Sequence, residues 1–304
     1  MVRVTPPLRI SIVTPAFNSR ETILDTIESI SSQQYPDVEH IVMDGGSADG
    51  TTDVLRSNES KLAFWTSEPD DGQYDAISKG LNVATGDVLG WLNADDMLMP
   101  GALHAIGRIF RSFPEVKWIS SLQPGRWDTD GFLAGFDSVP GFSHDAFLDG
   151  LYLPGTRAKG YWIQQESTFW RRELWTPAAA KAMKSCQLAG DFALWAHFFA
   201  SHELVGVEYP LGGFRNRAGQ KSQDIERYIA EARVVLQRAQ STRTSRGRRS
   251  APFLYLNSRG LLSVSKRLER AVERRFGYSA KRVRNADLRE PGGRWVLENI
   301  AFMP

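Results

Sequence analysis

The first part of the chain alternates short apolar runs with amphipathic stretches. The apolar runs are rich in β-branched residues, which is typical of strands, whereas Ile23, Ile27 and Ile30 recur at helical spacing. Strands that alternate with helices at this spacing predict an α/β fold with a mostly parallel sheet flanked by helices. We expect strands at residues 9–14, 38–43, 62–67, 88–92 and 116–121, and helices at about residues 21–34, 47–57, 74–84 and 100–113.

The middle of the chain is less regular. Residues 123–160 are rich in glycine, proline and aromatic side chains, which predicts a loop region. Residues 178–203 return to helical character, with Asp191 near their middle, and residues 212–222 read as a polar loop with glycine and arginine.

The C-terminal part differs in charge from the rest. From residue 225 we expect mainly helices, interrupted at residues 242–252 by an Arg/Ser-rich stretch. Residues 227–284 hold many Lys and Arg but only three acidic residues, although the whole chain has a net charge of only +2. Such a segment favours an anionic partner such as a membrane surface, and a solvated helical face is the alternative. The sequence thus predicts two units, a domain at residues 1–222 and a basic, mainly helical extension at residues 223–304.

Composition excludes several other classes of protein. The 304 residues are 42% hydrophobic, which is sufficient for a core without disulfides. Cys186 is the single cysteine, so no intramolecular disulfide is possible, and we expect it to be a buried apolar residue in a reducing cytoplasm. No apolar run approaches the ~18 residues of a membrane span, and residues 1–7 lack the apolar core of a secretory signal. No nucleic-acid recognition motif accompanies the basic segment.

Polar residues gather just after the expected strands. In parallel sheets, ligands bind beyond the carboxyl ends of the strands, so these residues are expected to share one edge. A hard divalent cation there needs only one or two carboxylates together with substrate phosphates. Turns alone also favour aspartate, so a single Asp pair carries little weight. The residues concerned are 14–18, Asp44, Asp70, Asp71 and 93–96.

Five segments resemble the family 2 glycosyltransferases of the GT-A fold. Three of them include the end of an expected strand and the residues after it, and they read ISIVTPAFN at residues 10–18, IVMDGGSADGT at 41–51 and GDVLGWLNADD at 86–96. Two later ones read QESTFWRR at residues 165–172 and GDFALW at 190–195. The resemblance covers roughly residues 8–222 and implies a Rossmann-like sheet that binds a nucleotide-diphosphate sugar.

The resemblance also implies a donor site with a divalent cation. Asp44 is then expected to accept a hydrogen bond from the nucleotide base. Asp95 is expected to bind Mg²⁺ or Mn²⁺, and Asn93 stands in place of the first acidic residue of the family's Asp-x-Asp motif. The donor-binding residues that the resemblance implies are Thr14, Pro15, Ala16, Asn18, Asp44, Asp71, Asp75, Asn93, Ala94 and Asp95.

Three later segments complete the implied site. Asp191 matches the family's general base, which takes the proton of the acceptor hydroxyl; a helix N-cap is the alternative reading. Arg215 and Arg217 are expected to clamp the donor diphosphate, unless their loop is simply solvated, and Arg217 stands where relatives often have His. Gln165 and Glu166 are the expected acceptor-binding residues. Five aromatic residues are either an acceptor platform or core: Trp162, Phe169, Trp170, Trp175 and Trp195.

The preferred hypothesis is an inverting glycosyltransferase that acts on a saccharide or lipid-linked saccharide in polysaccharide or glycolipid biosynthesis. It is expected at the cytoplasmic face of a membrane, held there by the basic segment. A non-catalytic sugar-nucleotide-binding scaffold is the first alternative. A sugar-phosphate nucleotidyltransferase is the second, but residues 14–18 lack the Gly-rich phosphate loop that it requires.

Overall fold

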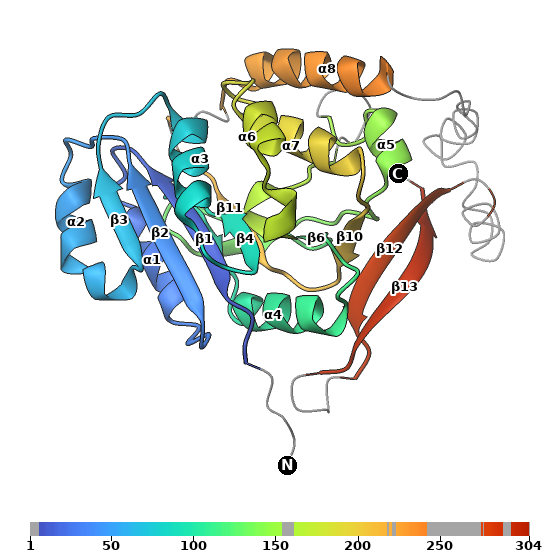
Figure 1. The fold of residues 1–304 in the computed structure, drawn as a ribbon, viewed down its shortest axis with the longest axis horizontal. Coiled ribbons are helices and arrows are strands. Elements are labelled where there is room, and N and C mark those ends of the chain that lie inside the picture. The colour runs from blue at the N-terminus through green and yellow to red at the C-terminus, as the bar shows by residue number, and fades with distance from the viewer. Residues whose placement is uncertain are drawn as a thin grey trace.

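The computed structural model describes residues 6–153, 161–217, 219–220, 223–241, 275, 277–287 and 293–303. A nine-stranded sheet in the order β13-β12-β10-β6-β9-β4-β1-β2-β3 forms the centre, with helices on both faces (Figure 1). A smaller four-stranded sheet has the order β5-β11-β7-β8. The predicted α/β fold with a mostly parallel sheet is confirmed.

Four parallel strands form one half of the main sheet. They are β1 (Ile10–Ala16), β2 (Val38–Asp44), β3 (Phe64–Ser67) and β4 (Val88–Trp91), with β1 between β2 and β4. All seven residues of β1 are buried, as expected for a strand covered on both faces. The connections contain α1 (Ile23–Ser31), α2 (Thr51–Ser57), the 3₁₀ turn η1 (Glu59–Lys61) and α3 (Gln73–Val83), close to the predicted positions.

The other half of the main sheet is mixed. Strand β9 (Thr168–Arg171) runs antiparallel to both β4 and β6 (Trp118–Ser121), and β10 (Leu204–Val207) runs parallel to β6. The helices of this half are α4 (Ala102–Ser112), α6 (Pro177–Met183) and α7 (Gly190–Phe199), and two 3₁₀ turns flank β9, η2 (Gln165–Ser167) and η3 (Arg172–Leu174). Helices α3, α6 and α7 cover one face of the sheet, and α4 covers the other (Figure 1).

Stacked tryptophans fill the space between the sheet and α7. Trp195 of α7 stacks on Trp91 and Trp118, with ring centroids 5.7 and 5.6 Å apart, and meets Trp170 at its edge. These four rings are among the largest fully buried side chains. The core interpretation therefore holds for Trp170, Trp195 and the buried Phe169, whereas Trp162 is 36% exposed.

The segment expected to be loops contains short elements. Strands β7 (Gly125–Trp127) and β8 (Leu133–Phe136) pair with each other, and β7 also pairs with β11 (Gly212–Arg215), which in turn pairs with β5 (Met97–Leu98). Helix α5 (His144–Leu148) follows β8. The small sheet therefore links the segment after β4 to the predicted basic loop at residues 212–222, whose first part is a strand.

The C-terminal extension is joined to the main sheet. Helix α8 (Ile225–Ser241) packs on α7, and strands β12 (Tyr278–Asn285) and β13 (Trp295–Phe302) form a hairpin whose β12 runs parallel to β10. The expectation of mainly helices after residue 222 holds for α8 but is wrong for residues 278–285 and 295–302, which form strands. Tyr278, Ala280 and Val283 of β12 are buried. The Arg/Ser-rich stretch at 242–252 lies outside the described residues.

Two further features concern the length of the helices and the single cysteine. Within the described ranges, no helix combines the length and the apolar character that crossing a membrane requires. Cys186 is a free thiol, half-buried against the core, and burial raises its pKa.

Candidate active site

One pocket of about 860 Å³ lies at the carboxyl ends of β1 and β4. Its walls also include the start of α3, the turn η2, helix α7, helix α8 and the segment after β11. Nine of the residues predicted from the sequence line it: Pro15, Ala16, Asn93, Ala94, Asp95, Gln165, Glu166, Asp191 and Arg217.

Asp95 follows β4 and is held by the segment after β11. Arg217 Nε donates to Asp95 Oδ2 across 2.9 Å, and Gln220 Nε2 donates to the same oxygen across 2.8 Å. Gln220 also donates to the carbonyl of Arg215, which ties the segment to its own strand. The guanidinium group of Arg217 therefore forms an ion pair with Asp95 in the wall of the pocket.

The neighbouring Asp96 is fully buried beneath the pocket. Its carboxylate accepts from the backbone N–H of Arg215 at 3.0 Å and from Asn93 Nδ2 at 3.1 Å. Burial, followed by the charge of Asp95, raises the pKa of Asp96 well above its usual value. Asn93 in turn accepts from Gln73 Nε2 at 2.8 Å. A neutral amide at position 93 therefore suits a place where a further carboxylate would face two others.

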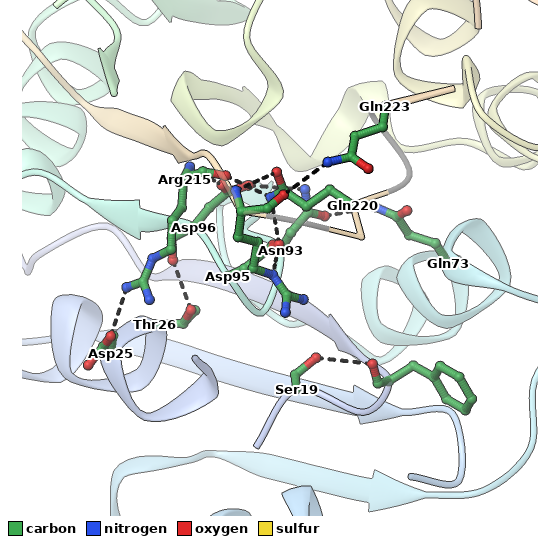
Figure 2. Close-up of polar contacts among 12 residues, drawn as sticks. Ser19, Asp25, Thr26, Gln73, Asn93, Asp95, Asp96, Arg215, Gln220 and Gln223 are labelled. Atoms are coloured by element: carbon green, nitrogen blue, oxygen red, sulfur yellow. Dashed lines mark hydrogen bonds and ion pairs between the residues drawn. The ribbon is translucent and has the colours of Figure 1, made fainter. Parts of the chain in front are cut away.

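Arg215 does not occupy the position expected of a phosphate-binding residue. Its side chain is 2% exposed and does not line the pocket; Nη2 instead donates to Asp25 Oδ2 of α1 at 2.8 Å (Figure 2). Successive residues of a strand point to opposite faces, so Phe214 of β11 faces the pocket while Arg215 faces α1. Arg215 therefore joins β11 to α1, and Arg217 is the arginine of this segment that reaches Asp95.

Asp191 lies in the first turn of α7 and faces the pocket. Burial raises its pKa to about 6, against hydrogen bonds from the Phe192 N–H and the Tyr228 hydroxyl. The helix N-cap is Ala189, so the N-cap interpretation of Asp191 is wrong. Gly190 precedes it because a Cβ there would lie 2.6 Å from the Met183 carbonyl oxygen and 2.7 Å from the Tyr74 ring.

Glu166 is another carboxyl group of the pocket lining and is only 2% exposed. Burial raises its pKa to about 8, with a further contribution from the charge of Asp191. Its Oε1 has no hydrogen-bond partner among the residues that the structure describes. At neutral pH Asp191 and Glu166 therefore differ in protonation state, because Asp191 is largely ionised whereas Glu166 is largely protonated.

Three predicted donor residues lie close to the pocket but have internal partners. Thr14 is buried and is hydrogen bonded with His40 Nε2 at 2.9 Å. Asp44 is 2% exposed and accepts from the hydroxyls of Ser47 and Ser67. Asn18, in the left-handed region with φ of 48°, lines a smaller, open pocket of about 630 Å³ that also includes Arg217.

Two other predicted donor residues, Asp71 and Asp75, do not line the pocket. Asp75 pairs with Lys79 and Lys184 at 3.2 and 2.6 Å, which lowers its pKa, and it does not line the pocket. Asp71 is exposed and also outside the pocket lining, whereas Asp70 and Gln73 are part of it. The turn before α3 therefore presents Asp70, not Asp71.

The sequence interpretation missed residues from two regions. Arg126, Asp137 and Gln164 line the pocket near the small sheet, with Asp137 joined to Arg126 at 3.3 Å and to Gln164 at 3.2 Å. Tyr228 comes from α8, which was assigned to a separate extension. Their contacts span long stretches of sequence, so no local pattern marks them.

The described residues offer few protein ligands for a metal ion. No group of three or more His, Cys, Asp or Glu side chains with metal-binding geometry occurs in the described parts of the chain. Asp95 nevertheless fits a cation bound mainly by a substrate, because Mg²⁺ typically uses one or two protein carboxylates with substrate phosphates. Its half-buried oxygens at the pocket wall already accept from the charged Arg217.

Comparisons with known proteins match part of the chain to one family. Residues 11–113 match the model of glycosyl transferase family 2. An uncharacterized glycosyltransferase of Mycobacterium tuberculosis is 41% identical over 88 residues, 29% of this chain and 34% of that protein. A PGL/p-HBAD biosynthesis glycosyltransferase of Mycobacterium bovis is 35% identical over 91 residues, 29% of this chain and 36% of that protein. The chain thus spans about a third of the curated relatives it matches.

Two solved structures share the fold at low sequence identity. TarS of S. aureus in complex with UDP-GlcNAc has a TM-score of 0.52 at 13% identity, over 74% of this chain and 66% of that one. Glucosyl-3-phosphoglycerate synthase of Mycobacterium tuberculosis, in complex with Mn²⁺, UDP and phosphoglyceric acid, has a TM-score of 0.50 at 19% identity, over 78% and 80% of the two chains. Residues 11–113 thus match the model of glycosyl transferase family 2, and the sheet and helices have the GT-A fold that these solved structures share.

Proposed function

We propose that the protein is an inverting glycosyltransferase that transfers a sugar from a nucleoside diphosphate sugar to an acceptor hydroxyl. The observation that carries the proposal is that Asp95 and Asp191, from the two halves of the main sheet, line one pocket. Asp95 belongs to the segment after β4, and Asp191 begins α7. A group for the leaving diphosphate and a base for the acceptor are thus available in the same pocket.

Asp191 is proposed to act as the general base. Its carboxylate takes the proton of the acceptor hydroxyl while that oxygen forms a bond to the anomeric carbon. The bond from the anomeric carbon to the diphosphate oxygen breaks, and the diphosphate leaves with the electron pair. One displacement of this kind, with no covalent intermediate, inverts the anomeric centre. With a pKa of about 6, Asp191 is mostly ionised at neutral pH.

The diphosphate is proposed to bind at the Asp95 side of the pocket. A Mg²⁺ or Mn²⁺ ion at Asp95 would neutralise the charge that develops on the leaving group. Glucosyl-3-phosphoglycerate synthase, of similar fold, was crystallised with Mn²⁺ and UDP, which supports this part. Arg217 lies on Asp95 in the structure and offers its remaining guanidinium N–H groups to phosphate oxygens. Asp70, Pro15 and Ala16 are proposed to contact the nucleoside, with the buried Asp44 beneath them.

The acceptor is proposed to lie between Asp191 and η2. Glu166, protonated at neutral pH, has a hydroxyl to donate, and Gln165 supplies an amide. Trp162 lines the same wall and offers an aromatic face to a sugar ring. The acceptor class proposed is a saccharide or lipid-linked saccharide in polysaccharide or glycolipid biosynthesis, which agrees with the naming of the M. bovis relative.

Location at a membrane surface is a separate part of the proposal. The basic segment 227–284, most of which lies outside the described residues, would attract anionic lipid headgroups at the cytoplasmic face. Sedimentation with phosphatidylglycerol vesicles and with phosphatidylcholine vesicles tests it. Binding only to the anionic vesicles is expected, and equally weak binding to both would remove the membrane part alone.

Thermal stabilisation by nucleotides tests the transfer function. The melting temperature is measured with UDP, GDP, dTDP and CMP, each in Mn²⁺ and in EDTA, and a ligand that binds only the native state raises it. We expect one diphosphate to stabilise the protein in Mn²⁺ and less so in EDTA. Stabilisation without any release of nucleoside diphosphate from the matching sugar donor would favour the scaffold alternative, and no response to any nucleotide would contradict the proposal.

A further inference from the structure

Helix α8 lies across α7 on the face of the molecule opposite α4 (Figure 1). Its buried residues Ala232, Val235 and Leu236 belong to the same core cluster as the residues of α7. Neither α8 nor the basic segment lies within residues 11–113, which match the family. The helix therefore lies outside the matched segment and still contributes to the pocket through Ile225 and Tyr228.

Tyr228 brings α8 into contact with the proposed base. Its hydroxyl lies 3.2 Å from Asp191 Oδ1 and 3.3 Å from Oδ2, so one O–H is shared between both carboxylate oxygens. The ring packs on Trp162, with centroids 5.3 Å apart, and both side chains line the pocket. The hydroxyl therefore has a fixed position relative to Asp191 and to the proposed acceptor wall.

Glu231 fixes the segment that leads into Asp191. One turn after Tyr228 on α8, its Oε2 accepts from three backbone N–H groups, those of Gln187, Leu188 and Ala189, at 2.9, 2.8 and 3.1 Å. From the other side, the hydroxyl of Tyr74 donates to the carbonyl of Leu188 at 2.7 Å. Hydrogen bonds to an ionised acceptor are among the stronger ones, so this short segment is held from two sides.

We propose that Tyr228 and Glu231 are positioning residues that hold Asp191 in the orientation needed for proton transfer. The proposal rests on the proposed function, because it assigns α8 to the same catalytic site. Tyr228 donates to the ionised form of Asp191 and so favours the form that accepts the acceptor's proton. Glu231 fixes the backbone from which Asp191 projects.

Other titratable groups also face Asp191 and enter the test. They are Tyr74 of α3, Glu166 of η2 and Cys186 of the segment before α7. Each of them remains in a Tyr228→Phe variant. A change in the titration of Asp191 in that variant is therefore due to the lost hydroxyl.

The test compares Tyr228→Phe with Tyr35→Phe. Tyr35 loses a hydroxyl bonded to the Leu8 carbonyl at 2.8 Å, does not line the pocket, and serves as the matched control. The ¹³C carboxyl resonance of Asp191 is titrated, and the pH profile of kcat/KM is recorded. Tyr228→Phe should raise the pKa of Asp191 by about one pH unit and move the acid limb of the profile equally. An unchanged pKa, or an equal loss of rate at every pH, would overturn the role of Tyr228.

A second comparison tests Glu231. Glu231→Ala should speed amide exchange at residues 187–189 and lower kcat about tenfold while the Kd for nucleoside diphosphate stays unchanged. Glu231→Gln should restore part of kcat, and Glu226→Gln, an exposed residue of the same helix, should change none of these values. Unchanged exchange and kcat in Glu231→Ala would overturn the role of Glu231. Because exchange and the carboxyl titration need no turnover, they still read these contacts if the protein transfers no sugar.

Discussion

Arg217 Nε lies 2.9 Å from Asp95 Oδ2, so a side-chain cation contacts the carboxylate that is proposed to bind a metal ion. Gln220 donates to the same oxygen and keeps the segment after β11 over the pocket. The positive charge of Arg217 is therefore already present where a diphosphate would lie. Arg217 and the proposed metal ion would then both neutralise negative charge on the leaving diphosphate.

Replacing Arg217 distinguishes its contribution to diphosphate binding from that of the metal ion. In EDTA, Arg217→Gln should weaken binding of the nucleoside diphosphate about tenfold, since a charge-assisted hydrogen bond contributes about 1.5–3 kcal/mol. In Mn²⁺ the loss should be smaller, because Asp95 is then free for the cation. Isothermal titration calorimetry measures both values. Arg56→Gln, which removes an arginine of an exposed surface pair, is the control, and equal affinity of the two variants in EDTA would contradict the clamp.

Asn93 is expected to be required for stability beside Asp96. Asn93→Asp restores an acidic residue at the first position of the motif, but it places a carboxylate next to buried Asp96 and close to Asp95. The pKa of the new carboxyl group should be higher in the folded protein than in the unfolded chain, where it is about 4. The variant should therefore lose stability as pH increases above about 4. Urea denaturation should show a loss of about 1–3 kcal/mol at pH 8 and little loss at pH 4. A loss that does not depend on pH would exclude this explanation.

Glu166→Gln should change the pH dependence of stability in the opposite direction. The folded-state pKa of Glu166 is raised to about 8, so the wild-type protein loses stability as pH rises from about 4.5 to 8, whereas Gln stays neutral. The stability of the variant relative to wild type should therefore increase across this window and level off above it. Denaturant unfolding at several pH values measures the difference. A difference that is flat between pH 5 and 8 would show that Glu166 is ionised in the folded protein.

Arg215 should affect folding and leave donor binding unchanged. Asp25→Asn removes the counter-charge of a buried guanidinium, and because Asp25 is 46% exposed, a loss of about 1–2 kcal/mol is expected. The Kd for the nucleoside diphosphate should not change. Asp53→Asn, which breaks an exposed pair, should cost less than about 0.5 kcal/mol. Weaker nucleotide binding in Asp25→Asn would return Arg215 to the donor site.

The parallel half of the sheet was predictable because its signals are local. Each strand from β1 to β4 is a short apolar run, and α1 repeats Ile23, Ile27 and Ile30 on its buried face. The hairpin of β12 and β13 escaped prediction because its strands carry several charged residues, and β12 joins β10, more than seventy residues earlier in the chain. Composition there indicated a basic helix, and only tertiary pairing makes it a strand.

The candidate site likewise contains residues that local sequence predicts and residues that it does not. Residues at strand ends, such as Asp95, are placed by the rule that parallel strands present their carboxyl ends at one edge. The side chain direction of Arg215 was missed because its segment was taken as a loop, and only the strand β11 fixes which face each residue occupies. Tyr228 was missed because its partner Asp191 lies on another element, and nothing in the sequence near either residue marks the contact.

The central claim is that Asp191 is the base of a sugar transfer that Asp95 supports from the donor side. The most direct measurement is release of nucleoside diphosphate from the matching sugar donor by wild type and Asp191→Asn, with nucleotide affinity measured in parallel. The account predicts that Asp191→Asn lowers kcat by about 10²- to 10⁴-fold while nucleotide affinity stays within about twofold. It also predicts that the wild-type rate falls below pH 6. Transfer at the wild-type rate by Asp191→Asn would contradict the account.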